Sequence, residues 1–221
     1  MNRVVVKLGG AVAADSAGTV LALADRDEVC VVHGAGEQIT LEMERAGIPV
    51  LFVGGRRVTT PEALYVVRRS FASVGEALCA ALGPRAVQLF GDEIGLQAVP
   101  VPELGLVGDP IPTAPTVLVD ALESGGIPVV APLAAGPLNV NADEAAAALA
   151  QALGAERLLF LTDVDGLILN GEVVDRIDTG DATDLLDRAL LEGGIVPKLR
   201  AAVSAAQAGV PVAIGRTAVV A

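Results

Sequence analysis

Short apolar runs rich in Val, Ile and Leu alternate with longer helical stretches along the whole 221-residue chain. Glycine, proline or polar residues separate most of the runs from the stretches that follow them. This rhythm is typical of strand–helix–strand units, because two parallel strands need a long crossover connection, which is usually a helix. The sequence therefore predicts an α/β fold, a three-layer αβα sandwich with a central, mainly parallel sheet.

The apolar runs predict strands at residues 3–8, 28–33, 86–90, 127–131, 157–162 and 211–214. Helices are expected at residues 15–25, 37–46, 62–82, 116–123, 142–153, 184–191 and 197–208. Smaller β elements are expected as a hairpin of residues 50–53 and 57–59, an excursion at residues 95–110 and a second hairpin at residues 167–177. In the second hairpin, Asn170 and Gly171 favour a two-residue turn at the tip.

The composition argues against several functional classes. Because 52% of the residues are hydrophobic, the chain is too apolar to be disordered. Its net charge of −12, with no basic stripe, would repel a nucleic acid. The two cysteines, Cys30 and Cys79, make neither a disulfide framework nor a four-cysteine zinc site. With no signal-peptide core and no uninterrupted membrane span, the sequence predicts a soluble, cytoplasmic protein that does not bind membranes.

No linker or internal repeat divides the sequence, so a single domain is expected, with a soft boundary between residues 1–131 and residues 132–221. In open α/β sheets, ligands bind beyond the carboxyl ends of the strands. The loops that follow the predicted strands are therefore the expected places for chemistry.

Glycine-rich turns follow the first two predicted strands. Lys7 stands inside an apolar strand before Gly9 and Gly10, whose backbone N–H groups can bind a phosphate beside the lysine. The alternative is a strand-end lysine that reaches water. His33 precedes Gly34-Ala35-Gly36 at a helix start, a pattern that favours anion binding. His33 itself, the only histidine, fits a structural role better than a catalytic one.

Two polar clusters lie in the middle of the chain. Arg56 and Arg57 are adjacent, and an arginine fork matches a carboxylate, although a solvated surface pair is the alternative. Asn139 and Asn141 share one face before a predicted helix, so that their amides can bind a polar substrate. Asn141 equally suits a helix N-cap, and Asp143 can serve the helix dipole or orient lysines.

Two further loops carry weaker signals. Thr162-Asp163-Val164-Asp165-Gly166 follows an apolar strand, where α/β proteins commonly contact a nucleotide, although a polar turn is the alternative. Gly193 and Gly194 precede Lys198 at a predicted helix start, where the helix N-terminus and the lysine would form a positive locus. An ordinary surface lysine is the alternative.

Taken together, these motifs resemble the amino acid kinase family, whose order they follow over nearly the whole chain. The matching stretches are Val6-Lys7-Leu8-Gly9-Gly10, Val32-His33-Gly34-Ala35-Gly36, Arg57-Val58-Thr59, Leu104-Gly105-Leu106-Val107-Gly108, Asn139-Val140-Asn141-Ala142-Asp143, Leu161-Thr162-Asp163-Val164-Asp165-Gly166 and Gly193-Gly194-Ile195-Val196-Pro197-Lys198. The Asn-Val-Asn-Ala-Asp run with the later glycine pair and lysine is similar to the acetylglutamate branch of this family.

The resemblance implies phosphoryl transfer from ATP to the side-chain carboxylate of N-acetyl-L-glutamate, which gives N-acetyl-L-glutamyl 5-phosphate in arginine biosynthesis. It implies that residues 1–131 form the amino-acid side and residues 132–221 the ATP side. Three residues would be catalytic: Lys7 and Lys198 would flank the transferring group, and Asp143 would orient both lysines. The amino acid would be bound by Ala35, Gly36, Arg57, Asn139 and Asn141.

The resemblance also implies a nucleotide site. Its residues would be Gly9, Gly10, Thr162, Asp163, Val164, Asp165, Gly166, Leu167, Ile168, Leu190, Leu191, Glu192 and Gly194. Mg²⁺ would be held mainly by the phosphates of ATP, and no protein ligand is expected for it.

The sequence departs from the family pattern in three places. Ala35 replaces the middle of three glycines, and its methyl group is expected to narrow the site. The stretch after Asp92 is short, and residues 215–220 are expected to be all of the final edge strand. The first strand begins without the N-terminal helix of arginine-inhibited hexameric relatives, which implies an arginine-insensitive homodimer.

Two alternatives stay open. The first is a related kinase that acts on aminoadipate or glutamate linked to a carrier protein, but an acidic carrier would need a basic docking surface, and the charge of −12 argues against one. The second is a ligand sensor without activity, against which the two lysines and Asp143 argue. A uridylate or carbamate kinase fits less well, because Arg57 and the asparagine pair suit an amino acid.

Overall fold

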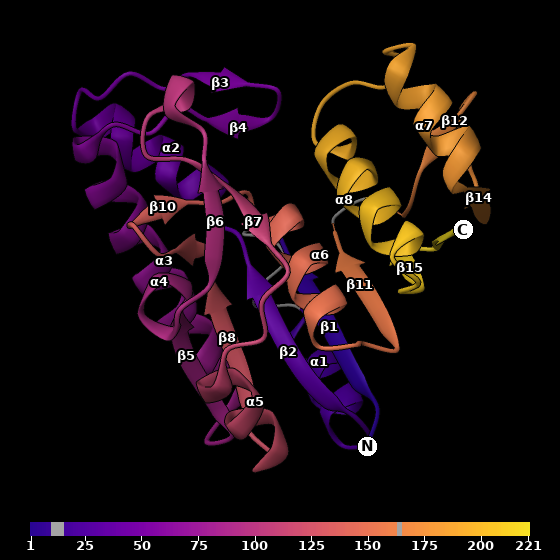
Figure 1. Cartoon of the computed structure of the whole chain (residues 1–221), viewed down its shortest axis with the longest axis horizontal. Coiled ribbons are helices and arrows are strands. Elements are labelled where there is room, and N and C mark those ends of the chain that lie inside the picture. The colour runs from indigo at the N-terminus through magenta and orange to yellow at the C-terminus, as the bar shows by residue number, and fades with distance from the viewer. Residues whose placement is uncertain (10–15, 163–164) are drawn as a thin grey trace.

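A computed structural model describes residues 1–9, 16–162 and 165–221 of the chain. The candidate residues Gly10, Asp163 and Val164, and the first residue of the helix expected at 15–25, lie outside these ranges. A central sheet of eight strands runs through the molecule with helices on both faces (Figure 1). The three-layer α/β architecture predicted from the sequence is confirmed.

The order of the strands places the middle of the sheet between β11 and β1. Across the sheet, the strands are β14 (Arg176–Asp178), β16 (Thr217–Val220), β15 (Val212–Ile214), β11 (Arg157–Leu161), β1 (Arg3–Leu8), β2 (Glu28–His33), β8 (Ile127–Ala131) and β5 (Ala86–Phe90). All neighbours are parallel except β15 and β16, which are antiparallel. The four strands from residues 1–131 thus form one half of the sheet, from β1 to β5, and the four later strands form the other half, from β11 to β14.

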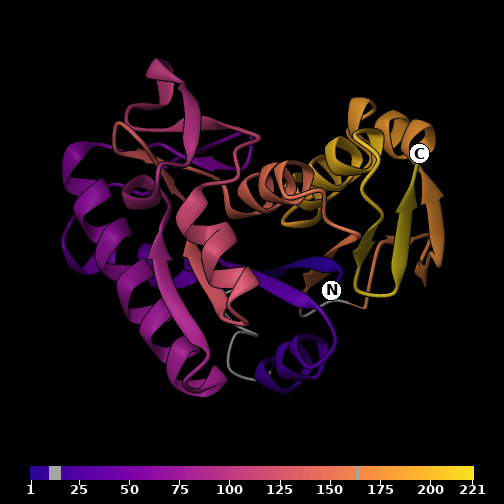
Figure 2. The ribbon, with the colours of Figure 1, turned by 60° about the horizontal axis from the view of Figure 1, so that its bottom comes forward.

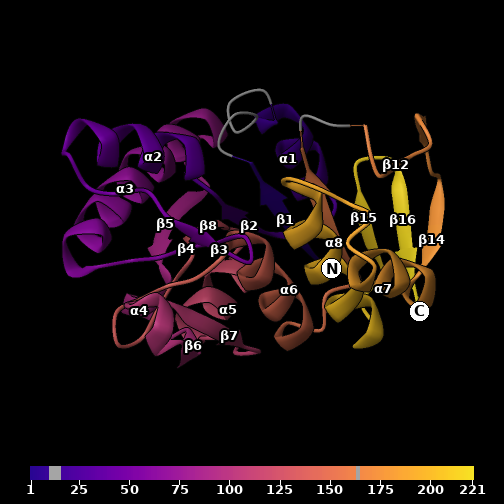
Figure 3. The ribbon, with the colours of Figure 1, turned by 90° about the horizontal axis from the view of Figure 1, so that it is seen from above.

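The helices form the two outer layers. They are α1 (Ala17–Ala24), α2 (Gly36–Arg45), α3 (Pro61–Leu82), α4 (Gly91–Ile94), α5 (Thr116–Glu123), α6 (Ala142–Ala152), α7 (Thr179–Asp187) and α8 (Ile195–Gln207), with a 3₁₀ turn at Pro102–Leu104. Figure 3 shows α1, α2 and α3 on one side of the sheet and α5, α6, α7 and α8 on the other. No helix in the described ranges is long and apolar enough to cross a membrane.

The two-residue period of β1 decides which side chains meet which helices. Val4, Val6 and Leu8 are buried in the cluster that also contains side chains of α1 and α3. Val5 is buried in the cluster formed with α6 and α8. Because side chains alternate between the faces of a strand, Lys7 lies on the same face as Val5 and points toward α6 and α8.

In the described part of the chain, four small hairpins surround the sheet. They pair β3 (Phe52–Val53) with β4 (Arg56–Arg57), β6 (Gln97–Pro100) with β7 (Gly108–Ile111), β9 (Leu133–Ala134) with β10 (Leu138–Asn139), and β12 (Ile168–Leu169) with β13 (Glu172–Val173). The expected tip of the last hairpin is confirmed, because Asn170 and Gly171 both have positive φ, 53° and 84°.

Several predicted elements differ from the structure. The hairpin expected at residues 167–177 ends at Val173, since Arg176–Asp178 pairs with β16 in the central sheet. The helix expected at 184–191 begins at Thr179, because Asp178 caps it by accepting a hydrogen bond from the backbone N–H of Asp181. The helix α4 and the β9–β10 pair were not predicted.

The expectation that the final segment forms an edge strand is wrong. β16 lies between β15 and β14, so β14 is the edge strand on this side of the sheet. Figure 2 shows the yellow C-terminal strand flanked by the orange strand β14. β16 turns back and pairs antiparallel with β15 along one of its edges. Its other edge stays available for hydrogen bonds, and β14 pairs with that edge in parallel.

Candidate active site

A cavity of about 350 Å³ opens at the carboxyl ends of β1, β2 and β11. Here the chain adds β2 on one side of β1 and β11 on the other, which is the kind of switch point where α/β sheets bind ligands. The cavity brings ten predicted site residues together. They are Lys7, Gly9, Ala35, Gly36, Arg57, Asn139, Asn141, Asp143, Thr162 and Lys198.

One carboxylate joins two lysines at this cavity. The Nζ of Lys7 lies 2.7 Å from Oδ1 of Asp143, and the Nζ of Lys198 lies 3.5 Å from Oδ2. Lys7 and Asp143 are only 5% and 4% exposed. Burial lowers the pKa of Lys7, and the charge of Lys198 lowers it further, whereas Asp143 opposes this shift. Two ammonium groups share one negative charge, which leaves a net positive locus for an anion.

The neighbourhood of these three side chains follows from the fold. Lys7 lies one residue before the end of β1, on the face that α6 and α8 cover. Asp143 lies in the first turn of α6, and Lys198 lies in the first turn of α8. Asn141 caps α6, since its Oδ1 accepts hydrogen bonds from the backbone N–H groups of Asp143 (2.8 Å) and Glu144 (3.2 Å). The cap fixes the turn that carries Asp143.

A second positive group, Arg57, is buried without an acidic partner. Its Nη2 donates to the backbone carbonyl of Gly36 (3.0 Å) and to Oγ1 of Thr40 (2.8 Å), and the guanidinium lies 4.6 Å from the ring centre of Phe52. Within the described ranges it forms no ion pair. Burial lowers the pKa of Arg57. Because a buried charge is costly unless it is paired, this guanidinium indicates an anionic ligand such as a carboxylate.

The two asparagines have different surroundings. Asn139 is buried, and its Nδ2 donates to Oγ1 of Thr59 at 3.0 Å, while Thr59 donates to the carbonyl of Arg57 at 2.8 Å. The side-chain oxygen of Asn141 is used by the helix cap, and its Nδ2 lies 3.5 Å from the carbonyl of Gly55. The N-cap alternative for Asn141 is confirmed, so that only its amide nitrogen remains for a substrate.

Ala35 fits its position without strain. Its φ of −144° suits any residue. The residue is 2% exposed and packs in an apolar cluster with Ile39 and Met43. Little of its methyl group therefore faces the cavity that it lines, and the expected narrowing is small.

His33 lies on the other face of the sheet from Lys7. Its ring packs edge-on against Phe71 of α3, with centroids 5.7 Å apart, and neither ring nitrogen has a hydrogen-bond partner among the residues that the structure describes. Burial lowers the pKa of His33 to about 4. The ring is thus neutral at pH 7 and does not line the cavity, which supports the structural interpretation of this histidine.

The residues expected to bind the nucleotide are less closely gathered. Thr162 and Gly9 line the cavity, whereas Asp165, Gly166, Leu167, Ile168, Leu190, Leu191, Glu192 and Gly194 do not. Leu167 is fully buried, its N–H donates to Thr217 (2.8 Å), and its carbonyl accepts from Val174 (2.8 Å). Gly194 caps α8, and its carbonyl accepts a hydrogen bond from Lys198. The nucleotide role of these eight residues stays a prediction.

Sequence reasoning gave no separate role to three contributors to the site, although Arg56 was noted beside Arg57 and Thr59 lies in a matching stretch. Phe52 lies under Arg57, Thr59 holds Asn139, and Arg56 bonds to two other elements. Phe52 and Arg57 are direct cross-strand partners in the β3–β4 hairpin. The register of a two-residue turn at Gly54 and Gly55 was the signal that could have found this pair.

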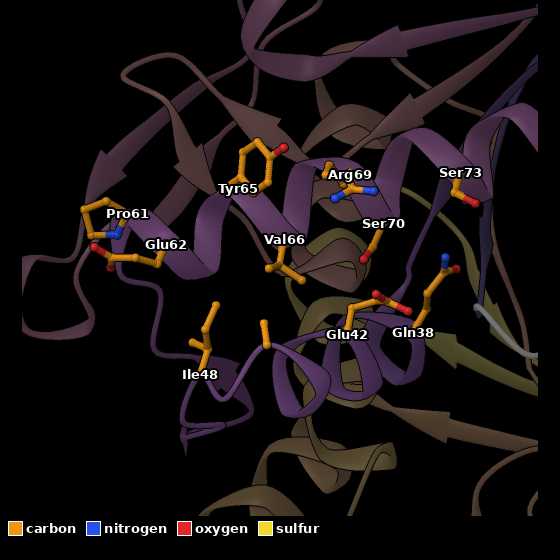
Figure 4. Close-up of a pocket in the computed structure, with 11 residues that line it drawn as sticks. Gln38, Glu42, Ile48, Pro61, Glu62, Tyr65, Val66, Arg69, Ser70 and Ser73 are labelled. Carbon is orange, nitrogen blue, oxygen red and sulfur yellow. The ribbon is translucent and has the colours of Figure 1, made fainter.

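A larger hollow of about 740 Å³ lies elsewhere, between α2 and α3 (Figure 4). Gln38 and Glu42 face it from α2, and Tyr65 and Arg69 from α3. It contains none of the predicted site residues. Size alone therefore does not identify the site, and the smaller cavity holds the lysines.

The fold and the basic groups of the smaller cavity define a class: α/β proteins with an anion-binding site at the carboxyl ends of their strands. A comparison with protein families is more specific. The model of the amino acid kinase family matches residues 2–216, and the chain belongs to this family.

Sequence relatives agree with this family. The chain is 44% identical to an acetylglutamate kinase of Rubrobacter xylanophilus, over 97% of the chain and 88% of the relative. It is 42% identical to an acetylglutamate kinase of Saccharopolyspora erythraea, over 82% of the chain and 66% of the relative. The expected family, and within it the acetylglutamate branch, are confirmed.

Solved structures share the fold. The protein smu.665 from Streptococcus mutans superposes with a TM-score of 0.90 at 30% identity, over 99% of this chain and 98% of that one. An N-acetylglutamate synthase from Neisseria gonorrhoeae superposes with a TM-score of 0.85 over 100% of this chain and 59% of that one. At 21% identity, the second likeness shows the fold alone.

The neutral His33 predicts a pH dependence of stability. Between pH 6.5 and about 4 the unfolded chain protonates this histidine while the folded chain keeps it neutral. The free energy of unfolding therefore falls as the pH is lowered through this window, by about 3 kcal/mol at most from this group. Urea unfolding at pH 7 and pH 4.5 measures the loss. His33→Leu, which cannot titrate, is expected to lose less stability than the wild type, and equal losses would contradict the assignment.

Proposed function

We propose that the protein is an acetylglutamate kinase, which transfers the γ-phosphoryl group of ATP to the side-chain carboxylate of N-acetyl-L-glutamate. The observation that carries the proposal is the Lys7–Asp143–Lys198 bridge in the same cavity as the unpaired Arg57. The names of the relatives support the same activity. The product would be an acyl phosphate and ADP.

The two lysines suit the charge of phosphoryl transfer. This reaction needs positioning and charge neutralisation, because negative charge is spread over the oxygens of the transferring group. Lys7 and Lys198 approach Asp143 from different elements, so their ammonium groups can contact different oxygens of that group. Asp143 keeps the lysines together and needs no proton transfer of its own.

The site needs no general base for this reaction. A glutamate side chain has an ordinary pKa near 4.3, so the acceptor is already a carboxylate at pH 7. One carboxylate oxygen forms the new bond to phosphorus as the bond between the γ-phosphorus and the oxygen of ADP breaks. No proton has to be removed from the acceptor, and no histidine among the described residues lines the cavity.

The remaining residues bind and orient the amino acid. Arg57 would hold the α-carboxylate, which would pair the buried guanidinium. Asn139, through its amide group, would bind the acetylated amino group. The backbone N–H groups of Ala35 and Gly36 at the start of α2 would hold oxygens of the acceptor.

ATP and its magnesium ion would enter from the other side, past Gly9 and Thr162. Among the described residues, no group of three or more His, Cys, Asp or Glu side chains is placed to hold a metal ion. As the family resemblance implies, Mg²⁺ would be held mainly by the ATP phosphates, where it offsets their charge. The homodimer and the arginine insensitivity stay predictions of the family resemblance, and the cytoplasmic location stays a prediction from the sequence.

The lysine bridge predicts a loss of turnover without a loss of folding. In Lys7→Ala and Lys198→Ala, the transferring group loses a neutralising charge, and kcat is expected to fall at least about a hundredfold. The measurement is ATP-dependent formation of the acyl phosphate from N-acetyl-L-glutamate, trapped with hydroxylamine. Circular dichroism and thermal melting of each variant serve as the folding control. Wild-type kcat in both variants would contradict the mechanism.

Arg57 predicts a different kinetic change. In Arg57→Ala the α-carboxylate loses a charge-assisted hydrogen-bonded pair, so the KM for N-acetyl-L-glutamate is expected to rise about tenfold to a hundredfold. The KM for ATP should stay within about twofold of the wild type, because the arginine is on the amino-acid side. An unchanged KM for the amino acid would remove the proposed role of Arg57.

A further inference from the structure

The β3–β4 hairpin that carries Arg57 is tied to two other elements through the neighbouring Arg56. The Nη2 and Nε atoms of Arg56 lie 3.0 Å and 3.2 Å from Oε1 of Glu144 in α6. Its Nη1 pairs with Oδ1 of Asp109 in β7. One guanidinium therefore connects the hairpin, the first turn of α6 and the β6–β7 ribbon.

The first turn of α6 also carries Asp143, which contacts both catalytic lysines. Glu144 directly follows Asp143, and the backbone N–H groups of both are capped by Asn141. The Nδ2 of Asn141 also lies 3.5 Å from the carbonyl of Gly55 at the hairpin tip. Gly55 is next to Pro197, because a Cβ added there would lie 3.6 Å from its ring. The hairpin thus reaches across the cavity to α6 and to the start of α8.

The contact between Arg56 and Glu144 is more than a solvated surface pair. The side chain of Glu144 is 15% exposed, and that of Arg56 is 25% exposed. Burial raises the pKa of Glu144, and the Arg56 contact opposes this rise. Two nitrogen atoms of Arg56, Nε and Nη2, donate to the same oxygen of Glu144, Oε1. Two donors fix the orientation of the guanidinium and hence of strand β4, which carries it.

We propose that Arg56 is a positioning residue, which latches the β3–β4 hairpin over the cavity so that Arg57 stays directed at the carboxylate of the acceptor. Both arginines are in the two-residue strand β4, so a hairpin that lifts from α6 takes Arg57 with it. The guanidinium of Arg56 is occupied by two carboxylates and does not itself bind substrate. This inference rests on the proposed function for the identity of the acceptor.

The test compares Arg56→Ala, Glu144→Gln and the double variant with the wild type. The matched control is Arg3→Ala, because Arg3 also bridges two carboxylates, Glu28 and Glu123, but stands at the opposite end of β1. Steady-state kinetics give kcat and the KM of each substrate. Hydrogen exchange of residues 50–58 without ligand reports directly on the attachment of the hairpin.

Arg56→Ala and Glu144→Gln are each expected to raise the KM for N-acetyl-L-glutamate about fivefold to tenfold, with kcat and the KM for ATP within about twofold. The double variant should be no worse than the poorer single variant, because both remove the same contact. Exchange at residues 50–58 should quicken in these variants and stay unchanged in Arg3→Ala. Arg56→Lys, which keeps the charge but not the fork, should recover part of the KM.

Unchanged exchange and unchanged KM in Arg56→Ala would overturn the latch, and so would an equal rise in KM in Arg3→Ala. If the wild-type protein does not phosphorylate N-acetyl-L-glutamate at all, the proposed function fails. The exchange measurement then decides the latch alone, since it requires no substrate.

Discussion

The structure of the site depends on one carboxylate shared by two lysines. Lys7 and Lys198 are the only lysines in the chain, which otherwise uses arginine for its basic residues, and both contact Asp143. Burial and the neighbouring charge of Lys198 lower the pKa of Lys7, and the carboxylate of Asp143 between the two ammonium groups opposes this shift. The period of β1 and the cap of α6 bring these groups together. The net positive charge that remains is what an ATP γ-phosphoryl group would neutralise.

The basic groups of the cavity divide into those placed for phosphoryl transfer and one placed for binding the acceptor. Lys7 and Lys198 supply charge where a bond would be made and broken, while Arg57 supplies it where the acceptor would be held. Phe52 and Thr40 orient Arg57 inside the hairpin, and Arg56 attaches that hairpin to the turn that carries Asp143. Substrate binding and phosphoryl transfer would therefore share one mechanical support. In a protein of net charge −12, this concentration of basic groups also directs an anionic substrate to a single place.

The sequence was most informative where a buried strand or a helix cap leaves a strong pattern. The bounds of β1, β2, β5, β8 and α5 agree with the prediction to the residue. It was least informative where pairing across the chain decides the outcome: β14 joins the central sheet instead of a local hairpin, and β16 lies inside the sheet instead of at its edge. The same limit holds at the site. Sequence motifs located Lys7, Arg57, Asp143 and Lys198. The positioning role of Arg56 could not be predicted in this way, because it depends on a contact with Glu144, which is 88 residues away in the chain.

The central claim, that the two lysines face the transferring phosphoryl group together, has a direct spectroscopic test. Protein labelled with ¹³C at lysine Cε carries only two lysine side-chain resonances, because the chain has only two lysines. Free protein should show one of them titrating below the ordinary lysine range, since burial lowers the pKa of Lys7. A non-hydrolysable ATP analogue with Mg²⁺ and N-acetyl-L-glutamate is predicted to shift both resonances and to raise the pKa of Lys7. Resonances that stay in place when both ligands are bound would contradict the account.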